Sequence, residues 1–166
     1  MPYPKLANVI SFVGPSGSGK TTLICRLLDR FQTQGLKVAV LKHSHKAGLG
    51  DQGKDTGQFR RAGAQAVALT APGLLQISRF FPDEPPLTAA LAALAAEVDL
   101  VLVEGYKTSS LPKIAFVGPT LEKLVPEPSG IIALVSPAPV ESPLPVFHPR
   151  GIPELASFIK EYLGLP

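Results

Sequence analysis

Residues 14–21 read Gly-Pro-Ser-Gly-Ser-Gly-Lys-Thr and match the phosphate-binding pattern G-x-x-x-x-G-K-[ST] at every required position. Glycines allow left-handed backbone angles, so successive N–H groups can turn inward around phosphate oxygens. Lys20 would place its ammonium between the β- and γ-phosphates of a nucleotide, and the Thr21 hydroxyl would complete the coordination shell of a Mg²⁺ ion. We therefore predict that the nucleotide is bound by Gly14, Ser16, Gly17, Ser18, Gly19, Lys20, Thr21 and Thr22.

The carboxylate of Glu104 follows later in the chain, at the end of a strand-like run, a position that suits a Mg²⁺ site beside the phosphate loop. Residues 98–104 form the most hydrophobic strand-like run, and this run ends in Glu104. An apolar strand can deliver an acid beside a phosphate loop, where it holds Mg²⁺ or a Mg²⁺-bound water. A solvated acid at the end of a strand is the simpler interpretation of Glu104 alone, but the complete phosphate loop favours the metal. Lys20 and Glu104 are accordingly the candidate catalytic residues, and Thr21 and Glu104 the first candidate metal ligands.

The polar, glycine-rich stretch 42–57 follows a second strand-like run and is too polar to bury. It is also longer than most connections, which is typical of a functional loop. Its first residues stand at the carboxyl edge of the expected sheet, where α/β proteins bind ligands. Asp51 is a further candidate metal ligand. We predict ligand contacts from this stretch, from Arg60 after it and from Lys107, which follows Glu104. The predicted contact residues are Lys42, His43, Lys54, Asp55, Arg60 and Lys107.

Two features of this stretch have alternative explanations. His43 and His45 would point to one side of an extended chain. A transition-metal site needs more ligands than this pair, so polar ligand contacts or a solvated loop are the alternatives. Likewise, the sequence Gly-Lys-Asp-Thr at 53–56 also fits a tight turn that caps a helix.

The elements that must position these residues alternate between strands and helices. Charge-poor, strand-like runs occupy residues 9–13, 37–41, 98–104, 114–117 and 131–135, and helices are expected over residues 20–34, 59–64, 87–97 and 153–162. A turn at 71–73 between runs 66–70 and 74–78 predicts a hairpin. We therefore expect one α/β domain over residues 1–166, with the P-loop NTPase fold, a mainly parallel sheet flanked by helices and a hairpin extension. An apolar hairpin is marginal alone, so we expect a second copy to cover it.

Composition excludes several classes of protein. The net charge of +3 comes without a run of basic residues, which argues against a nucleic-acid-binding protein. The Ala/Leu-rich run 87–96 is too short to cross a membrane, and residues 1–5 lack the apolar core of a signal peptide, so we expect a cytoplasmic protein. Cys25 is the only cysteine, which excludes an internal disulfide. We expect its side chain to be partly buried.

The chain resembles the molybdopterin-guanine dinucleotide biosynthesis protein B family. The phosphate loop alone is generic, whereas the other segments, in this order, are much more specific. The resemblance rests on residues 14–22 and on Val-Ala-Val-Leu-Lys-His at 38–43, Asp-Gln-Gly-Lys-Asp-Thr at 51–56, Ala-Gly-Ala at 62–64, Asp-Leu-Val-Leu-Val-Glu-Gly-Tyr-Lys at 99–107 and Pro-Lys-Ile at 112–114.

This resemblance implies a GTP-binding accessory protein of molybdenum cofactor maturation. It would work beside the guanylyltransferase that joins GMP to molybdopterin, hydrolyse GTP feebly at most and form a homodimer. The sequence has no Asn-Lys-x-Asp guanine signature, so its patterns leave guanine and adenine both open. The alternatives are a small-molecule kinase that uses ATP or GTP, and a structural subunit with a vestigial phosphate loop. The kinase would require an arginine-rich lid, of which the sequence shows no sign.

Overall fold

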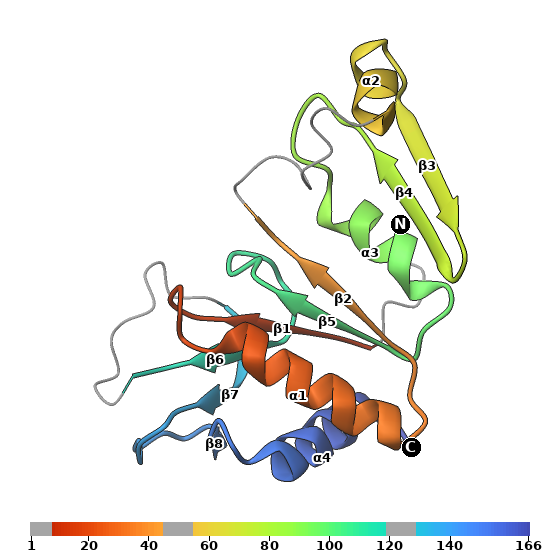
Figure 1. Cartoon of the computed structure of the whole chain (residues 1–166). Coiled ribbons are helices and arrows are strands. Elements are labelled where there is room, and N and C mark those ends of the chain that lie inside the picture. Colours follow the sequence, from red (N-terminus) through yellow and green to blue (C-terminus); the bar gives the residue numbers. More distant parts are fainter. Residues whose placement is uncertain (1–7, 45–54, 119–128) are drawn as a thin grey trace. The chain divides into compact units, whose positions relative to one another are not determined.

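The structure, a computed structural model, describes residues 8–44, 55–118 and 129–166 (Figure 1). The chain divides into two compact units. The larger unit contains residues 1–43 and 88–166, and the smaller unit contains residues 44–87.

A six-stranded sheet in the order β2-β5-β1-β6-β7-β8 forms the centre of the larger unit. Its strands are β1 (Val9–Val13), β2 (Val38–Lys42), β5 (Leu100–Glu104), β6 (Lys113–Phe116), β7 (Ile131–Val135) and β8 (Val146–Phe147). Every pair is parallel. The central strand β1 is buried throughout, as expected for a parallel strand covered on both faces. The prediction of an α/β fold with a mainly parallel sheet is therefore confirmed.

Helices α1 (Lys20–Thr33) and α4 (Ile152–Leu163) pack against each other and against the sheet (Figure 1). The apolar residues of α1 recur at helical spacing, and those that face the core are Leu23, Ile24, Leu27 and Phe31. Cys25 lies off this buried stripe and is exposed, so the prediction that it is partly buried is wrong. The third helix of this part of the chain, α3 (Leu87–Ala95), buries Leu91.

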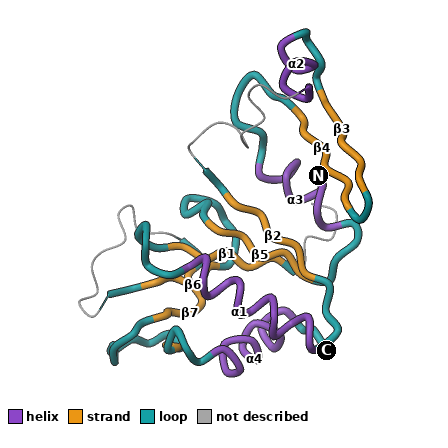
Figure 2. Tube along the Cα trace, viewed as in Figure 1, coloured by secondary structure: helices purple, strands orange, loops and turns teal. Residues whose placement is uncertain are grey.

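The smaller unit consists of α2 (Asp55–Arg61) and the antiparallel hairpin of β3 (Ala66–Ala71) and β4 (Leu74–Arg79). Figure 2 shows α2 at the end of the hairpin where β3 begins. The hairpin was predicted, but α2 begins four residues earlier than expected. Asp55 lies in the first turn of α2, where its carboxylate interacts favourably with the positive end of the helix dipole.

The connection between β5 and β6, residues 105–112, is fixed by a lysine that is completely buried. Lys113 begins β6, and its ammonium donates hydrogen bonds to the carbonyl oxygens of Ser109, Leu111 (2.9 Å) and Ser129 (2.8 Å). Burial lowers the pKa of Lys113.

In the described ranges, no helix is both long and apolar enough to cross a membrane.

Candidate functional site

The glycine-rich loop joins the end of β1 to the start of α1. A Cβ atom on Gly14 would lie 2.7 Å from the Cβ atom of Phe116, so only glycine fits against the end of β6. Gly19 caps α1 without a side chain, and the first turn of α1 contains no acidic residue. The backbone N–H groups at this end of a helix favour anions, and a carboxylate there would compete with a phosphate. The geometry of this loop is thus compatible with an anion at the start of α1.

Lys20 is folded back over this loop. Its ammonium donates hydrogen bonds to the carbonyl oxygens of Gly14 (3.0 Å) and Pro15 (2.5 Å) and to the hydroxyl of Ser18 (3.3 Å). Burial lowers the pKa of Lys20; the Glu104 carboxylate opposes this shift, and the Lys42 ammonium adds to it. A phosphate in the loop would supply the countercharge that favours the ammonium form.

Glu104 joins three elements at the carboxyl edge of the sheet. The parallel register places it between Phe12 of β1 and Lys42 of β2. The Thr21 hydroxyl donates to Glu104 Oε2 at 2.9 Å, and Lys42 Nζ lies 3.2 Å from Oε1. Because the Lys42 side chain is 58% exposed, this ion pair contributes only about 0–1 kcal/mol to stability. Its effect is to orient a carboxylate beside the loop.

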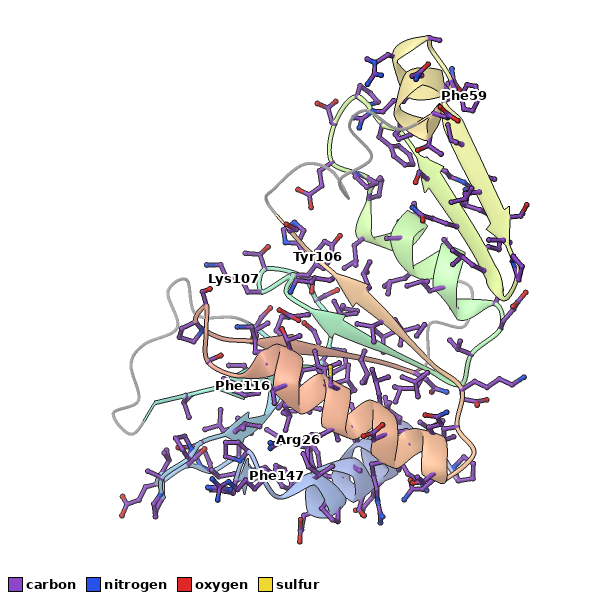
Figure 3. All side chains as sticks on the ribbon, in the orientation of Figure 1. Arg26, Phe59, Tyr106, Lys107, Phe116 and Phe147 are labelled. Atoms are coloured by element: carbon purple, nitrogen blue, oxygen red, sulfur yellow. The ribbon has the colours of Figure 1, made fainter. Side chains whose placement is uncertain are left out.

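A tight turn follows Glu104 and places an aromatic ring against His43, which follows β2. Gly105 has a φ of +110°, and a Cβ atom there would lie 2.9 Å from the Cβ atom of His43. The next residue, Tyr106, stacks on the His43 ring with 4.4 Å between centroids and an interplanar angle of 29°. Figure 3 shows Tyr106 and Lys107 on the turn that follows β5. The His43–Tyr106 pair, hereafter the aromatic pair, thus lies at the ends of β2 and β5, where the His43 backbone N–H donates to the Glu104 carbonyl at 2.9 Å.

The structure brings most of the predicted site residues together in the larger unit. These residues are the glycine-rich loop, Lys20, Thr21, Thr22, Lys42, His43, Glu104 and Lys107. Asp51, Lys54 and His45 lie outside the described residues, so the predictions about them are not tested. Among the described residues, no group of three or more His, Cys, Asp or Glu could hold a metal ion. The metal prediction therefore depends on the oxygens of Thr21 and Glu104.

The remaining two predicted contacts, Asp55 and Arg60, lie on α2 in the smaller unit. The Arg60 guanidinium carbon lies 4.7 Å from the centroid of the Phe80 ring, a cation–π distance. This contact accounts for the position of the Arg60 side chain within its own unit. Ligand contacts from these two residues stay predictions.

Three features were not found from the sequence. The Ser11 hydroxyl donates to the Gly105 carbonyl at 2.6 Å. A serine inside an otherwise apolar strand was the available signal, because a buried hydroxyl needs a partner. The buried Lys113 carried no such signal, since lysines at strand ends are usually exposed. The stacking of Tyr106 on His43 depends on the register between β2 and β5, which a sequence pattern does not specify.

A family model described as Molybdopterin guanine dinucleotide synthesis protein B matches residues 9–137 of the chain. The chain is 32% identical over 162 residues to the molybdopterin-guanine dinucleotide biosynthesis adapter protein of Haemophilus influenzae, covering 93% of this chain and 89% of that protein. It is 28% identical over 163 residues to the adapter protein of Escherichia coli, covering 93% of each. The structure superposes on a crystal structure of molybdopterin-guanine biosynthesis protein B with a TM-score of 0.78 and 28% identity, covering 94% and 99% of the two chains. Superposition on a MobB homologue from Bacillus stearothermophilus gives a TM-score of 0.73 at 29% identity, covering 95% and 98%.

Replacing Gly105 by alanine tests the close approach of this turn to β2. We expect Gly105→Ala to lower the free energy of unfolding by roughly 2–4 kcal/mol, because it adds a clash with His43 to an unfavourable φ. Gly35→Ala is the matched control: Gly35 has a φ of +78° but open space around its Cβ position, so the loss should be only about 1 kcal/mol. Urea unfolding measures both. Equal losses would contradict the close packing of Gly105 against His43.

Proposed function

This chain belongs to the molybdopterin guanine dinucleotide synthesis protein B family, and we propose that it works as a GTP-binding adapter in the biosynthesis of molybdopterin guanine dinucleotide. In this role it assists the guanylyltransferase that attaches GMP to molybdopterin, and it hydrolyses GTP weakly at most. Its relatives from Haemophilus influenzae and Escherichia coli are named as adapter proteins of this biosynthesis.

The contact between Thr21 and Glu104 carries the nucleotide part of the proposal. It joins the end of the glycine-rich loop to the acid that ends β5, at 2.9 Å. Mg²⁺ prefers a few hard oxygen ligands and keeps several waters. A hydroxyl and a carboxylate at this separation fit that preference, with the Thr21 oxygen as a ligand and Glu104 holding a metal-bound water. Lys20 lies on the same loop and would contact the terminal phosphates.

The same geometry favours an adapter over a fast hydrolase. Rapid hydrolysis needs a group that orients the attacking water in line with the γ-phosphate. Glu104, the acid beside the loop, already bonds to Thr21 through one carboxylate oxygen and to Lys42 through the other. A carboxylate in this arrangement can organise a metal shell, but its bonds leave it poorly placed to accept a proton from water.

A titration of GTP by calorimetry tests nucleotide binding directly. We expect Lys20→Ala to lose most of its GTP affinity with or without Mg²⁺, because the ammonium contacts phosphate whether or not metal is bound. Glu104→Gln should weaken only the binding that depends on Mg²⁺ and leave the Mg²⁺-free binding of GDP unchanged. Exposed Lys37 provides a control, and Lys37→Ala should bind GTP like the wild type. ATP titrated alongside decides between guanine and adenine.

Equal GTP affinity in Lys20→Ala and the wild type would refute the phosphate site. A Glu104→Gln variant with unchanged Mg²⁺ dependence would leave that residue as an ordinary acid at the end of a strand. Far-ultraviolet circular dichroism of each variant controls for loss of the fold.

A turnover assay separates the adapter from the alternative, a small-molecule kinase that uses ATP or GTP. The complete glycine-rich loop with Lys20 and Thr21 is the observation that keeps the kinase as a candidate. We expect the isolated chain to hydrolyse GTP far below the usual enzymatic range of about 1–10³ per second. Nucleosides and vitamins added as phosphoryl acceptors should not accelerate this hydrolysis. Rapid release of GDP or ADP that depends on an acceptor would favour the kinase.

We also propose that the chain forms a homodimer through its hairpin. The strand β4 exposes 64% of Leu75 and 56% of Ile77, which alternate with Gln76 and so share one face. An isolated two-stranded hairpin is marginal in water, and exposed apolar patches of this kind commonly mark protein interfaces. A second copy is the simplest partner, because a two-fold axis pairs one patch with itself.

Light scattering at micromolar concentration should therefore give twice the mass of the chain. The double variant Leu75→Lys with Ile77→Lys should scatter as a monomer, because each lysine would place a charge in the interface. Gln32→Lys adds one charge on the exposed side of α1 in the larger unit and should remain dimeric. A monomeric wild type would refute the homodimer.

A further inference from the structure

The Tyr106 backbone is held in a conformation that a tyrosine rarely adopts. Its φ is +55°, and no other non-glycine residue in the described ranges has a positive φ. A left-handed backbone costs an ordinary residue roughly 1–2 kcal/mol, and such residues persist only where the surroundings fix them. Glycine or asparagine would relieve this cost, so the presence of a tyrosine calls for a function of its ring.

Hydrogen bonds fix the chain on both sides of Tyr106. The Gly105 N–H donates to the Phe12 carbonyl at 3.1 Å, and the Ser11 hydroxyl donates to the Gly105 carbonyl at 2.6 Å. The Ser109 N–H closes the turn by donating to the Tyr106 carbonyl at 3.0 Å. The ring position is therefore set by β1 on one side and by the 106–109 turn on the other.

The buried ammonium of Lys113 fixes the far end of the same connection. Its three acceptors are backbone carbonyls of Ser109, Leu111 and Ser129, so it ties the end of the turn to the segment before β7. Burying an ammonium group is costly unless hydrogen bonds compensate for its lost hydration. Lys113, whose burial is energetically unfavourable, therefore holds the loop that carries Tyr106.

Both residues of the aromatic pair are partly exposed. The His43 N–H donates to the Glu104 carbonyl at 2.9 Å, which places the pair at the end of β2 and β5. Thr21 and Glu104 would hold Mg²⁺ at the terminal phosphates of the proposed nucleotide. The nucleoside is attached at the opposite end, beyond the α-phosphate. A ring that stacks on the aromatic pair would therefore come from a second molecule.

We propose that the aromatic pair is the binding platform for the flat heteroaromatic ring of a second ligand, a pterin that carries a phosphate. The inference rests on the proposed function, because the pterin class follows from the molybdopterin named in the family. Stacking of a flat ring on an aromatic side chain contributes about 1–3 kcal/mol. The phosphate of this ligand is assigned to the ammonium of Lys42, the residue before His43, whose side chain is 58% exposed and lies 3.2 Å from the Glu104 carboxylate.

The test uses the full chain saturated with GTP and Mg²⁺, with neopterin and neopterin monophosphate as probes followed by their own fluorescence. Tyr106→Asn removes the ring from a position whose φ asparagine tolerates, so the fold is expected to remain as stable as the wild type. This variant should bind both probes about tenfold more weakly, which corresponds to about 1.4 kcal/mol, with GTP affinity unchanged. Tyr106→Phe should retain binding. Lys42→Met should weaken the monophosphate more than neopterin, at GTP and Mg²⁺ concentrations that still saturate this variant, because Lys42 also contacts Glu104.

Tyr162→Asn is the matched control, since Tyr162 is also half-exposed and stacks on Phe158, with 6.2 Å between centroids, but lies on α4. It should bind both probes like the wild type. Wild-type affinity for the pterins in Tyr106→Asn would overturn the platform, as would a wild type that binds GTP but neither pterin. A Tyr106→Asn variant that loses GTP instead would assign the platform to guanine, which shares the aminopyrimidinone ring of a pterin, and would also overturn it. Failure of the proposed function can be distinguished from failure of the platform, because the wild type would then not bind GTP at all.

Discussion

The parallel pairing of β1 with β5 is the constraint on which the rest of the site depends. It places Phe12 beside Glu104, so the loop that leaves β1 emerges next to the acid that ends β5. From that single register follow the Thr21–Glu104 hydrogen bond and the bonds from β1 to Gly105. The pairing of β2 on the other side of β5 then adds Lys42 and His43 to the same edge. A slip of one residue would turn every side chain of the slipped strand to the other face and separate these groups.

Several features of the site oppose stability, and each is compensated locally. Lys20 is partly desolvated, Lys113 is completely buried, and Tyr106 has a left-handed backbone. Backbone carbonyls accept hydrogen bonds from both ammonium groups, and bonds to β1 fix the turn that carries Tyr106. Unfavourable features that the fold tolerates in this way tend to cluster at functional sites. Two of them, Lys20 and Tyr106, lie by the carboxyl edge of the sheet, which supports the proposal of a binding site at that edge.

The two units bury their apolar residues very differently. In the larger unit, strands and helices enclose a continuous core around β1, α1 and α4. In the smaller unit, the hairpin leaves large apolar side chains such as Leu75 and Ile77 mostly exposed. A hairpin of two strands cannot cover both of its own faces. This difference supports the proposals that the phosphate site lies in the larger unit and that two copies meet through the hairpin of the smaller one.

The sequence alone determined the features that depend on local pattern. The glycine-rich loop, the helix after it, the apolar strands and the hairpin follow from spacing and residue type, and the position of Glu104 at the end of a strand follows from the same pattern. The tertiary structure decided which strand ends meet. Only the parallel register brings Lys42 to Glu104 and Tyr106 to His43, and only packing buries Lys113 while leaving Cys25 exposed. The physical reason is that hydrophobic periodicity fixes which face of an element is buried, whereas the neighbours of each residue depend on contacts between segments far apart in the chain.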